Sequence, residues 1–215
     1  MKNIINYTCF MLFLACSFAV NAQLPKSEKQ YLIEFNKSTL GEQWQNKWNL
    51  QADPSSWYGV EIIDGHVTSL KLYRNNLKGA IPEGISALSN LKTLNLAFNT
   101  IEGNLPKDMF QLEALTSVRL EMNKLTGALP QDYSKMKSLE ELSMFNNLFQ
   151  GTIPEGIGEI STLKTLNLSS NYLEGSLPKS IEKLGNLERL ELFGNKLAGA
   201  IEVDLGRLVN LRELI

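Results

Sequence analysis

Six consecutive segments of 24 residues align over residues 67–210 without a single gap. Each closely follows the pattern L-x-x-L-x-L-x-x-N-x-L-x-G-x-I-P-x-x-I-x-x-L-x-x, with Asn always ninth and Gly always thirteenth. The asparagines are Asn75, Asn99, Asn123, Asn147, Asn171 and Asn195, and the glycines are Gly79, Gly103, Gly127, Gly151, Gly175 and Gly199. A fixed period of this length predicts a solenoid of stacked units that share one continuous core.

Each repeat opens with a short stretch in which apolar residues alternate, as Leu94 and Leu96 do. This period of two predicts a strand with one buried face, and six stacked strands predict a parallel sheet. The Asn that follows each strand carries two amide hydrogens and a carbonyl oxygen. We expect the stacked amides to bond the buried backbone groups of the turn.

The second half of the repeat predicts two further features. The Gly permits a backbone conformation that a Cβ atom would hinder. An Ile-Pro or Leu-Pro pair follows in five repeats and predicts a second extended segment at the proline, whereas Glu202 replaces that proline in the sixth repeat. Apolar residues three apart, as at Ile181 and Leu184, predict a turn of 3₁₀ or α helix on the outer face.

This motif resembles the plant-specific class of extracellular leucine-rich repeats, found in receptor-kinase ectodomains and in cell-wall inhibitors of polygalacturonase. The resemblance covers about two thirds of the chain. It implies an α/β solenoid, a right-handed leucine-rich repeat superhelix with a parallel sheet on the concave face and 3₁₀ or short helices outside. Because the repeated residues are scaffold positions, the resemblance implies a fold and no particular ligand.

Residues 23–66 resemble the N-terminal cap of the same class. Apolar residues in 28–36 have the spacing of an amphipathic helix. Plant members carry two cap cysteines, where this chain has Ser55 and Ile62. We therefore expect buried tryptophans, and no disulfide, to close the first rung; they are Trp44, Trp48 and Trp57. Cysteine-free caps of this kind resemble those of bacterial surface leucine-rich repeat proteins.

The first 22 residues have the features of a secretory signal peptide. Lys2 precedes an apolar run of about 12 residues and a cleavage site after Ala22. The run is too short for a transmembrane segment, which needs roughly 20 apolar residues. Both cysteines lie in this leader, so the mature chain has none, which suits a bacterium more than a plant or animal. We expect a secreted or cell-surface protein.

The residue inventory argues against catalysis. His66 is the only histidine, expected at an exposed turn between cap and repeats, and the mature chain has no cysteine. The formal net charge is −2 and there is no basic run, which argues against nucleic-acid binding. The sequence therefore predicts a protein that is not an enzyme and needs no metal or other cofactor.

The concave side is the better place to look for a function. Its seventh and eighth repeat positions, expected to be exposed and free of scaffold duty, hold aromatic residues, Met and Arg. These types are enriched where proteins bind one another. Charges of both signs on this side favour a polypeptide over a uniformly anionic glycan. The predicted partner-binding residues are Tyr73, Arg74, Phe98, Arg119, Glu121, Met122, Phe145 and Phe193.

These observations predict a recognition module that binds a protein or peptide on its concave face. Two alternatives stay open. Aromatic residues could instead serve as stacking platforms for a carbohydrate or cell-wall polymer, and the family resemblance alone implies an inhibitor of an extracellular hydrolase.

Residues 211–215 begin a seventh repeat, with Leu211 and Leu214 at buried strand positions. Solenoids require a polar terminal cap, and none follows here. We expect either a longer protein of which this sequence is a part, or an open sheet edge that pairs end to end with another chain.

Overall fold

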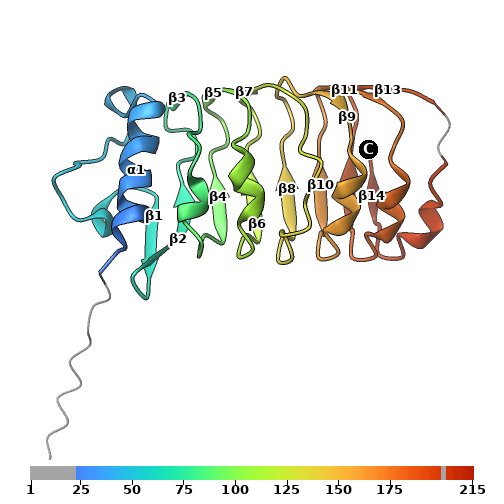
Figure 1. Cartoon of the computed structure of the whole chain (residues 1–215). Helices are drawn as coiled ribbons and strands as arrows, with labels where there is room; N and C mark the ends of the chain where they lie inside the picture. The colour runs from blue at the N-terminus through green and yellow to red at the C-terminus, as the bar shows by residue number, and fades with distance from the viewer. Residues whose placement is uncertain (1–22, 200–201) are drawn as a thin grey trace, which may run out of the picture.

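The computed structural model describes residues 23–199 and 202–215, which form an elongated stack of rungs (Figure 1). The largest sheet has eight strands in the order β1-β2-β4-β6-β8-β10-β12-β14, and we call it the concave sheet. Its strands are β1 (Val60–Ile63), β2 (His66–Lys71), β4 (Thr93–Asn95), β6 (Ser117–Arg119), β8 (Glu141–Ser143), β10 (Thr165–Asn167), β12 (Arg189–Glu191) and β14 (Glu213–Leu214). The pair β1–β2 is antiparallel, and every later pair is parallel.

The register of the concave sheet equals the sequence period. Leu70 faces Leu94, which faces Val118, each 24 residues further along. All three side chains are fully buried. The predicted alternation of buried and outward residues is therefore confirmed for these strands.

A second row of short strands, the lateral ribbon, runs along the upper edge of the stack in Figure 1. It consists of β3 (Lys78–Gly79), β5 (Thr100–Gly103) and β7 (Lys124–Leu125), followed by β9 (Gln150–Thr152), β11 (Tyr172–Gly175) and β13 (Lys196–Leu197). The second extended segment that we predicted from the proline is present, but its strands end ahead of the proline. Proline has no N–H group to donate to a ladder, so the residues before it make those bonds.

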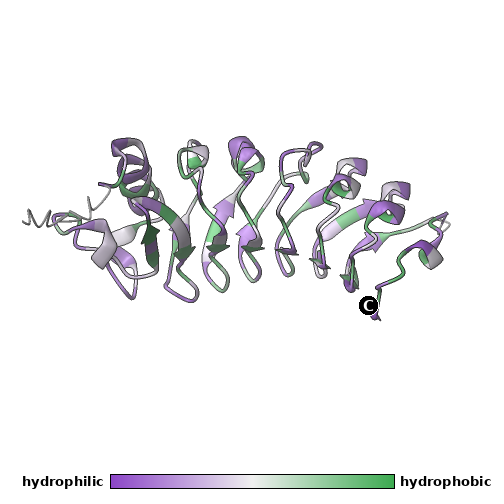
Figure 2. Cartoon of the chain, turned by 90° about the horizontal axis from the view of Figure 1, so that it is seen from below, coloured by the Kyte–Doolittle hydropathy of each residue, from purple (hydrophilic) through white to green (hydrophobic). Residues whose placement is uncertain are grey.

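Short 3₁₀ helices cover the outer face, as predicted. Figure 2 separates these outer helices, at the top of the view, from the strands beneath them. They are η3 (Ile85–Ala87), η4 (Lys107–Gln111), η5 (Glu155–Glu159), η6 (Lys179–Lys183) and η7 (Leu205–Arg207), and the cap adds η1 (Gly41–Gln43) and η2 (Pro54–Ser56). The helices η3 to η6 each bury an apolar residue, as η5 does with Ile157, while Leu205 of η7 packs partly buried against the core.

The repeated asparagines bond the backbone of two rungs at once. The Asn99 side-chain oxygen accepts the N–H groups of Asn75 and Leu77, both at 3.0 Å. Its amide donates to the carbonyls of Leu72 and Leu96 at 2.9 and 2.8 Å. Asn123, Asn147 and Asn171 donate in the same way. The predicted role of the asparagine stack is confirmed.

The repeated glycines adopt a conformation that other residues avoid. All six have φ between 78° and 109°. At Gly79 an added Cβ would also lie 2.2 Å from the carbonyl oxygen of Ser38, where the cap meets the first repeat. Both observations confirm the backbone role predicted for this position.

The N-terminal cap is an aromatic core covered by helix α1 (Lys26–Ser38). Ring centroids of Trp44 and Trp48 lie 4.9 Å apart, and those of Trp48 and Trp57 lie 4.8 Å apart. Phe35 brings α1 onto Trp44 at 6.1 Å. All four are buried, and each indole N–H donates to a backbone carbonyl. The buried tryptophans are as the sequence predicted.

Glu28 of α1 joins the cap to the first strand of the repeats. Its carboxylate lies 2.6 Å from His66 Nδ1 and accepts the Val67 N–H at 2.7 Å. Glu28 is only 2% exposed, whereas the His66 side chain is 38% exposed. His66 is thus partly exposed, as expected, but it begins β2 and also pairs with Glu28.

The predicted signal peptide, residues 1–22, lies outside the described residues. Within the described ranges, no helix is long and apolar enough to span a bilayer.

Candidate binding site on the concave sheet

The predicted partner-binding residues come from the strands of the concave sheet and the turns just after them. Arg119 is the last residue of β6. The other seven occupy the seventh or eighth repeat position, beyond the strand ends. Seven of the eight fall within the first four repeats, while Phe193 lies two rungs beyond Phe145, roughly 10 Å away at the spacing of neighbouring strands.

Tyr73, Arg74 and Phe98 form a cluster. The sequence predicted only that these residues lie on the same face. The Tyr73 and Phe98 rings lie 5.1 Å apart, tilted by 59°. The guanidinium carbon of Arg74 lies 5.8 Å from the Tyr73 centroid and 5.6 Å from that of Phe98, within the range of cation–π attraction. Tyr73 is 40% exposed, Arg74 is exposed and Phe98 is half-buried. We call these three residues the aromatic–arginine cluster.

The backbone conformation of the turns sets the direction of the side chains in this cluster. Arg74 and Phe98 have φ of 47° and 56°, in the left-handed region. The Arg74 N–H donates to Ala97 and the Phe98 N–H to Glu121, each at the seventh position of the next repeat. The turns are therefore bonded from rung to rung while their side chains leave the sheet.

The same left-handed conformation occurs at the eighth position of all six repeats. The remaining members are Met122, Asn146, Ser170 and Gly194, with φ between 51° and 68°. The eighth position therefore has a scaffold duty, contrary to our expectation. A left-handed residue costs about 1–2 kcal/mol unless it is Gly, so neighbouring turn bonds must hold it there.

Glu121 is not exposed, and the sequence-based expectation was wrong here. It is only 1% exposed, and its Oε1 accepts from Nη2 and Nε of Arg119 at 2.6 and 3.0 Å. Ala97 and Ser169, at the same repeat position, are buried as well. Strands about 4.8 Å apart bring successive turns close enough for neighbouring side chains to cover one another. The seventh position therefore mixes exposed rings with buried residues.

Arg119 is shared between two carboxylates. Its Nε lies 3.7 Å from Glu141, whose other oxygen accepts the Ser117 hydroxyl at 2.7 Å. Partial burial acts to lower the pKa of Arg119, but the hydrogen bond and charge of Glu121 outweigh it and raise the pKa. The second oxygen of Glu121 is buried without a hydrogen-bond partner among the described residues.

Met122 and Phe145 continue the apolar part of the site. Both are half-buried. The Asn146 side-chain amide lies 2.7 Å from the Met122 sulfur, which accepts its hydrogen bond. Together with the aromatic–arginine cluster they form a track four rungs long, or roughly 15 Å.

Sequence reasoning missed two exposed residues, one in the lateral ribbon and one just ahead of its strand β9. Leu148 and Tyr172 are 39% and 51% exposed. They occupy the tenth repeat position, where the other repeats have polar residues: Asn76, Thr100, Lys124 and Lys196. Two apolar residues at a repeat position that is otherwise polar could have been recognised in the sequence as a sign of a second exposed site.

The described residues contain no group of three or more His, Cys, Asp or Glu side chains that could hold a metal ion. The polar groups of the site are instead an arginine–glutamate pair and an arginine against rings.

Comparisons with known proteins match this architecture. The family profile described as Leucine rich repeat matches residues 65–125, and a second, Leucine Rich Repeat, matches residues 138–160 and 162–184. Residues 65–125, 138–160 and 162–184 are thus leucine-rich repeats, and the fold is that of a leucine-rich repeat solenoid. Leucine-rich repeat receptor protein kinase EMS1 of Arabidopsis thaliana is 39% identical over 95 residues, which are 43% of this chain and 8% of that kinase.

Solved plant ectodomains have the same fold. That of GASSHO1/SCHENGEN3 from Arabidopsis thaliana, in complex with CASPARIAN STRIP INTEGRITY FACTOR 2, superimposes with a TM-score of 0.82 at 26% identity over 86% of this chain and 23% of that one. Arabidopsis HAESA, in complex with the peptide hormone IDA and the co-receptor SERK1, gives 0.79 at 28% identity over 88% and 33%. The chain spans a third or less of the length of these relatives.

Proposed function

We propose that this chain is a recognition module, secreted or displayed at the cell surface, that binds a peptide or protein on its concave sheet without catalysing a reaction. The observation that carries the proposal is the aromatic–arginine cluster, which presents an exposed ring and an exposed guanidinium on one face. Tyr and Arg are among the residues that dominate binding energy at protein interfaces. Two similar ectodomains were solved with their binding partners, which supports the same use of the fold here.

The charges of the site favour a polypeptide partner. Arg74 makes no ion pair with any described residue, whereas Arg119 is already neutralised by Glu121. The unpaired guanidinium of Arg74 therefore lies beside aromatic side chains and not within a cluster of basic residues. A partner that offers one acidic group next to apolar side chains complements this arrangement better than a polyanion does.

The length of the site suggests the size of the bound segment. Four rungs span roughly 15 Å, and an extended peptide rises about 3.3 Å per residue. The track from Tyr73 to Phe145 therefore accommodates about five extended residues. Phe193 lies outside this span and would contact only a longer partner.

The proposal can be tested with a displayed peptide library. The mature chain is immobilised, binding peptides are selected, and their affinities are measured for the Tyr73→Ser/Arg74→Ser variant. We expect affinity to fall at least tenfold, since two exposed anchor residues are lost. Tyr58→Ser is the matched control, because Tyr58 is 48% exposed in the cap, away from the site.

The circular dichroism spectrum and the melting temperature of the Tyr73→Ser/Arg74→Ser variant must stay unchanged while its peptide affinity falls. Selected peptides that bind both variants equally would refute the concave site. Inhibition of wall-degrading hydrolases by the mature chain, with no selected peptide, would instead support the inhibitor alternative.

A further inference from the structure

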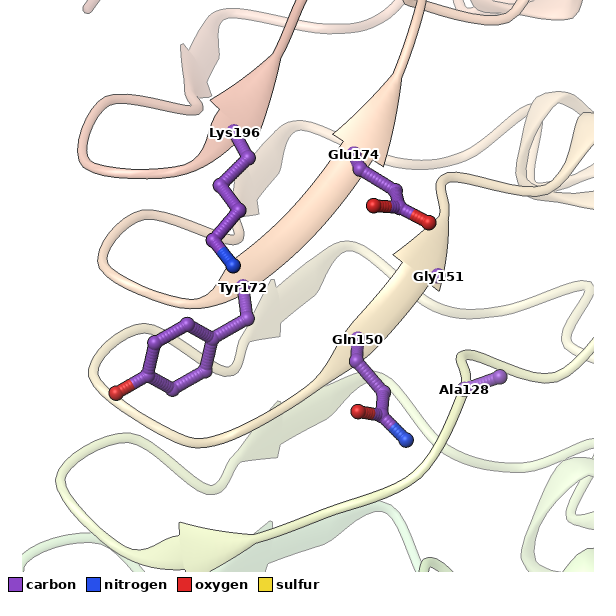
Figure 3. A pocket seen from close by; sticks show the side chains of 6 residues that line it. All are labelled: Ala128, Gln150, Gly151, Tyr172, Glu174 and Lys196. Atoms are coloured by element: carbon purple, nitrogen blue, oxygen red, sulfur yellow. The ribbon is translucent and has the colours of Figure 1, made fainter.

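A hollow of about 540 Å³ opens on the lateral ribbon, away from the concave sheet (Figure 3). It lies over β9, β11 and β13. Its lining residues are Ala128, Gln150, Gly151, Tyr172, Glu174 and Lys196. We propose that this hollow is a second binding site, which takes a neutral hexopyranose unit of an oligosaccharide or polysaccharide.

Strand register brings the walls of the hollow together. Tyr172 and Glu174 are two residues apart on β11, so both stand on the same face of the ribbon. Gln150 is the cross-strand partner of Tyr172, and Lys196 is the partner of Glu174. Four functional side chains therefore surround one point.

Small residues leave the space open. Gly151 has no side chain, and a Cβ built there would lie 3.7 Å from that of Ala128. Ala128 itself contributes only a methyl group. The floor is thus bare backbone and one methyl group, with larger side chains around it.

The chemistry of the walls suits a sugar. The Tyr172 ring is 51% exposed and offers a flat apolar surface for the C–H face of a pyranose. The side chains of Gln150, Glu174 and Lys196 make no hydrogen bond or ion pair with other described residues, which leaves an amide, an acceptor and a donor free. Sugar hydroxyls both donate and accept, as those of Ser and Thr do. Pockets with a few convergent polar groups around apolar surface are typical ligand sites.

The charge balance indicates a neutral ligand. Glu174 and Lys196 contribute one charge of each sign. The Lys196 ammonium also lies 5.5 Å from the Tyr172 ring centroid, where the ring attracts it. An anionic or cationic ligand would meet one repulsive charge for each attractive one.

The backbone argues against an added peptide strand at this place. The Tyr172 N–H already donates to Phe149, and the Ala198 N–H donates to Gly175. Peptides that extend a sheet need a free edge, whereas the hollow lies over the face of β11, which is paired on both sides. A ligand in the hollow must therefore be recognised by side chains.

Titration of the mature chain with neutral oligosaccharides tests the proposal. The probes are cellohexaose, laminarihexaose and mannohexaose, with an oligogalacturonate as the anionic comparator. Binding is measured by calorimetry and by NMR shifts of the lateral ribbon. We expect one neutral probe to bind, and Tyr172→Ala and Gln150→Ala each to weaken it at least tenfold. Tyr172 and Gln150 are exposed, so both variants should keep the wild-type melting temperature.

Two matched controls separate this site from the concave one. Tyr58→Ala removes an exposed ring in the cap, and Tyr73→Ser removes one on the concave sheet; both should leave the sugar affinity unchanged. No binding by any neutral probe, stronger binding of the oligogalacturonate, or binding that survives Tyr172→Ala would overturn the proposal. A selected peptide that contacts Tyr172 in place of a sugar would overturn it too.

Discussion

The side-chain amide of Asn123 donates to the carbonyl oxygen of Leu96, 27 residues earlier and one rung away, at 3.0 Å. Its side-chain oxygen accepts the Ile101 N–H, also at 3.0 Å. Asn123 is 8% exposed, so the backbone groups that it bonds lie away from water. One side chain thus satisfies the turn of the preceding repeat as well as its own.

Asn123→Ala should therefore destabilise the protein by about 1–3 kcal/mol, the cost of buried polar groups left without partners. Urea unfolding followed by circular dichroism measures the change. Thr126→Ala is the control in the same turn, because Thr126 is half-buried and its hydroxyl bonds only the exposed Asn104 side chain. Equal losses for the two variants would contradict the asparagine stack as the main support of the turns.

Glu28→Ala should loosen the cap. The change leaves the Val67 N–H and the His66 ring without their shared carboxylate, at a cost of about 1–3 kcal/mol. Hydrogen exchange should show faster exchange in α1 and β2, where the cap meets the repeats. Glu34→Ala, at an exposed position of the same helix, should leave exchange unchanged. If both variants exchanged at the wild-type rate in α1 and β2, the aromatic core alone would hold the cap.

Ser170→Val should cost about 1–2 kcal/mol, whereas Ser170→Gly should cost little. Ser170 has φ of 53°, and a β-branched residue is strained in the left-handed region. The sixth repeat already has Gly194 at the equivalent position, with φ of 68°. Thermal unfolding of the two variants provides the measurement. If valine were tolerated as well as glycine, the turn would not be fixed in this conformation.

Stability should fall at acidic pH partly through Glu155. Its carboxylate accepts the Ser180 N–H at 2.9 Å and the Lys179 N–H at 3.2 Å. The bond from Ser180 is the largest cause of the lowered pKa of Glu155. A carboxyl whose pKa is lower in the folded state stabilises it fully above the unfolded pKa of about 4.3, and this contribution is lost as pH falls through the folded value.

The melting temperature of wild type should therefore drop more steeply than that of Glu155→Gln below about pH 4.3. Glu159→Gln changes the net charge equally at an exposed position of the same helix and serves as the control. Parallel pH profiles for wild type and Glu155→Gln would show that the bonds to the next repeat do not depend on the ionised carboxylate.

Much of the fold could be predicted because its determinants are local and repeated. Leu94 and Leu96 alternate with outward residues, Asn99 ends the strand and Gly103 turns the chain, and each of these features acts within one repeat. The place of the lateral ribbon was harder to predict. Proline was the obvious signal, but the ladder bonds come from residues such as Thr100 and Thr126 that precede it.

The candidate site was predicted less well, because exposure depends on the neighbouring rungs. Tyr73 and Phe193 lie exposed at the seventh position, while Glu121 at the same position is almost fully buried. No pattern within a single repeat distinguishes them. Burial of Glu121 depends on the ion pair with Arg119 and on side chains that neighbouring turns place over it.

The sequence by itself determined the solenoid, its register, the asparagine stack and the aromatic cap, since a 24-residue period admits only one way to stack its apolar faces. Only the tertiary structure decided which side chains remain open to a partner. The left-handed turn at Arg74 places its guanidinium beside two rings, and the strand register places Tyr172 beside Lys196. Both arrangements depend on contacts between residues roughly one repeat apart. Those contacts form only when the rungs are stacked.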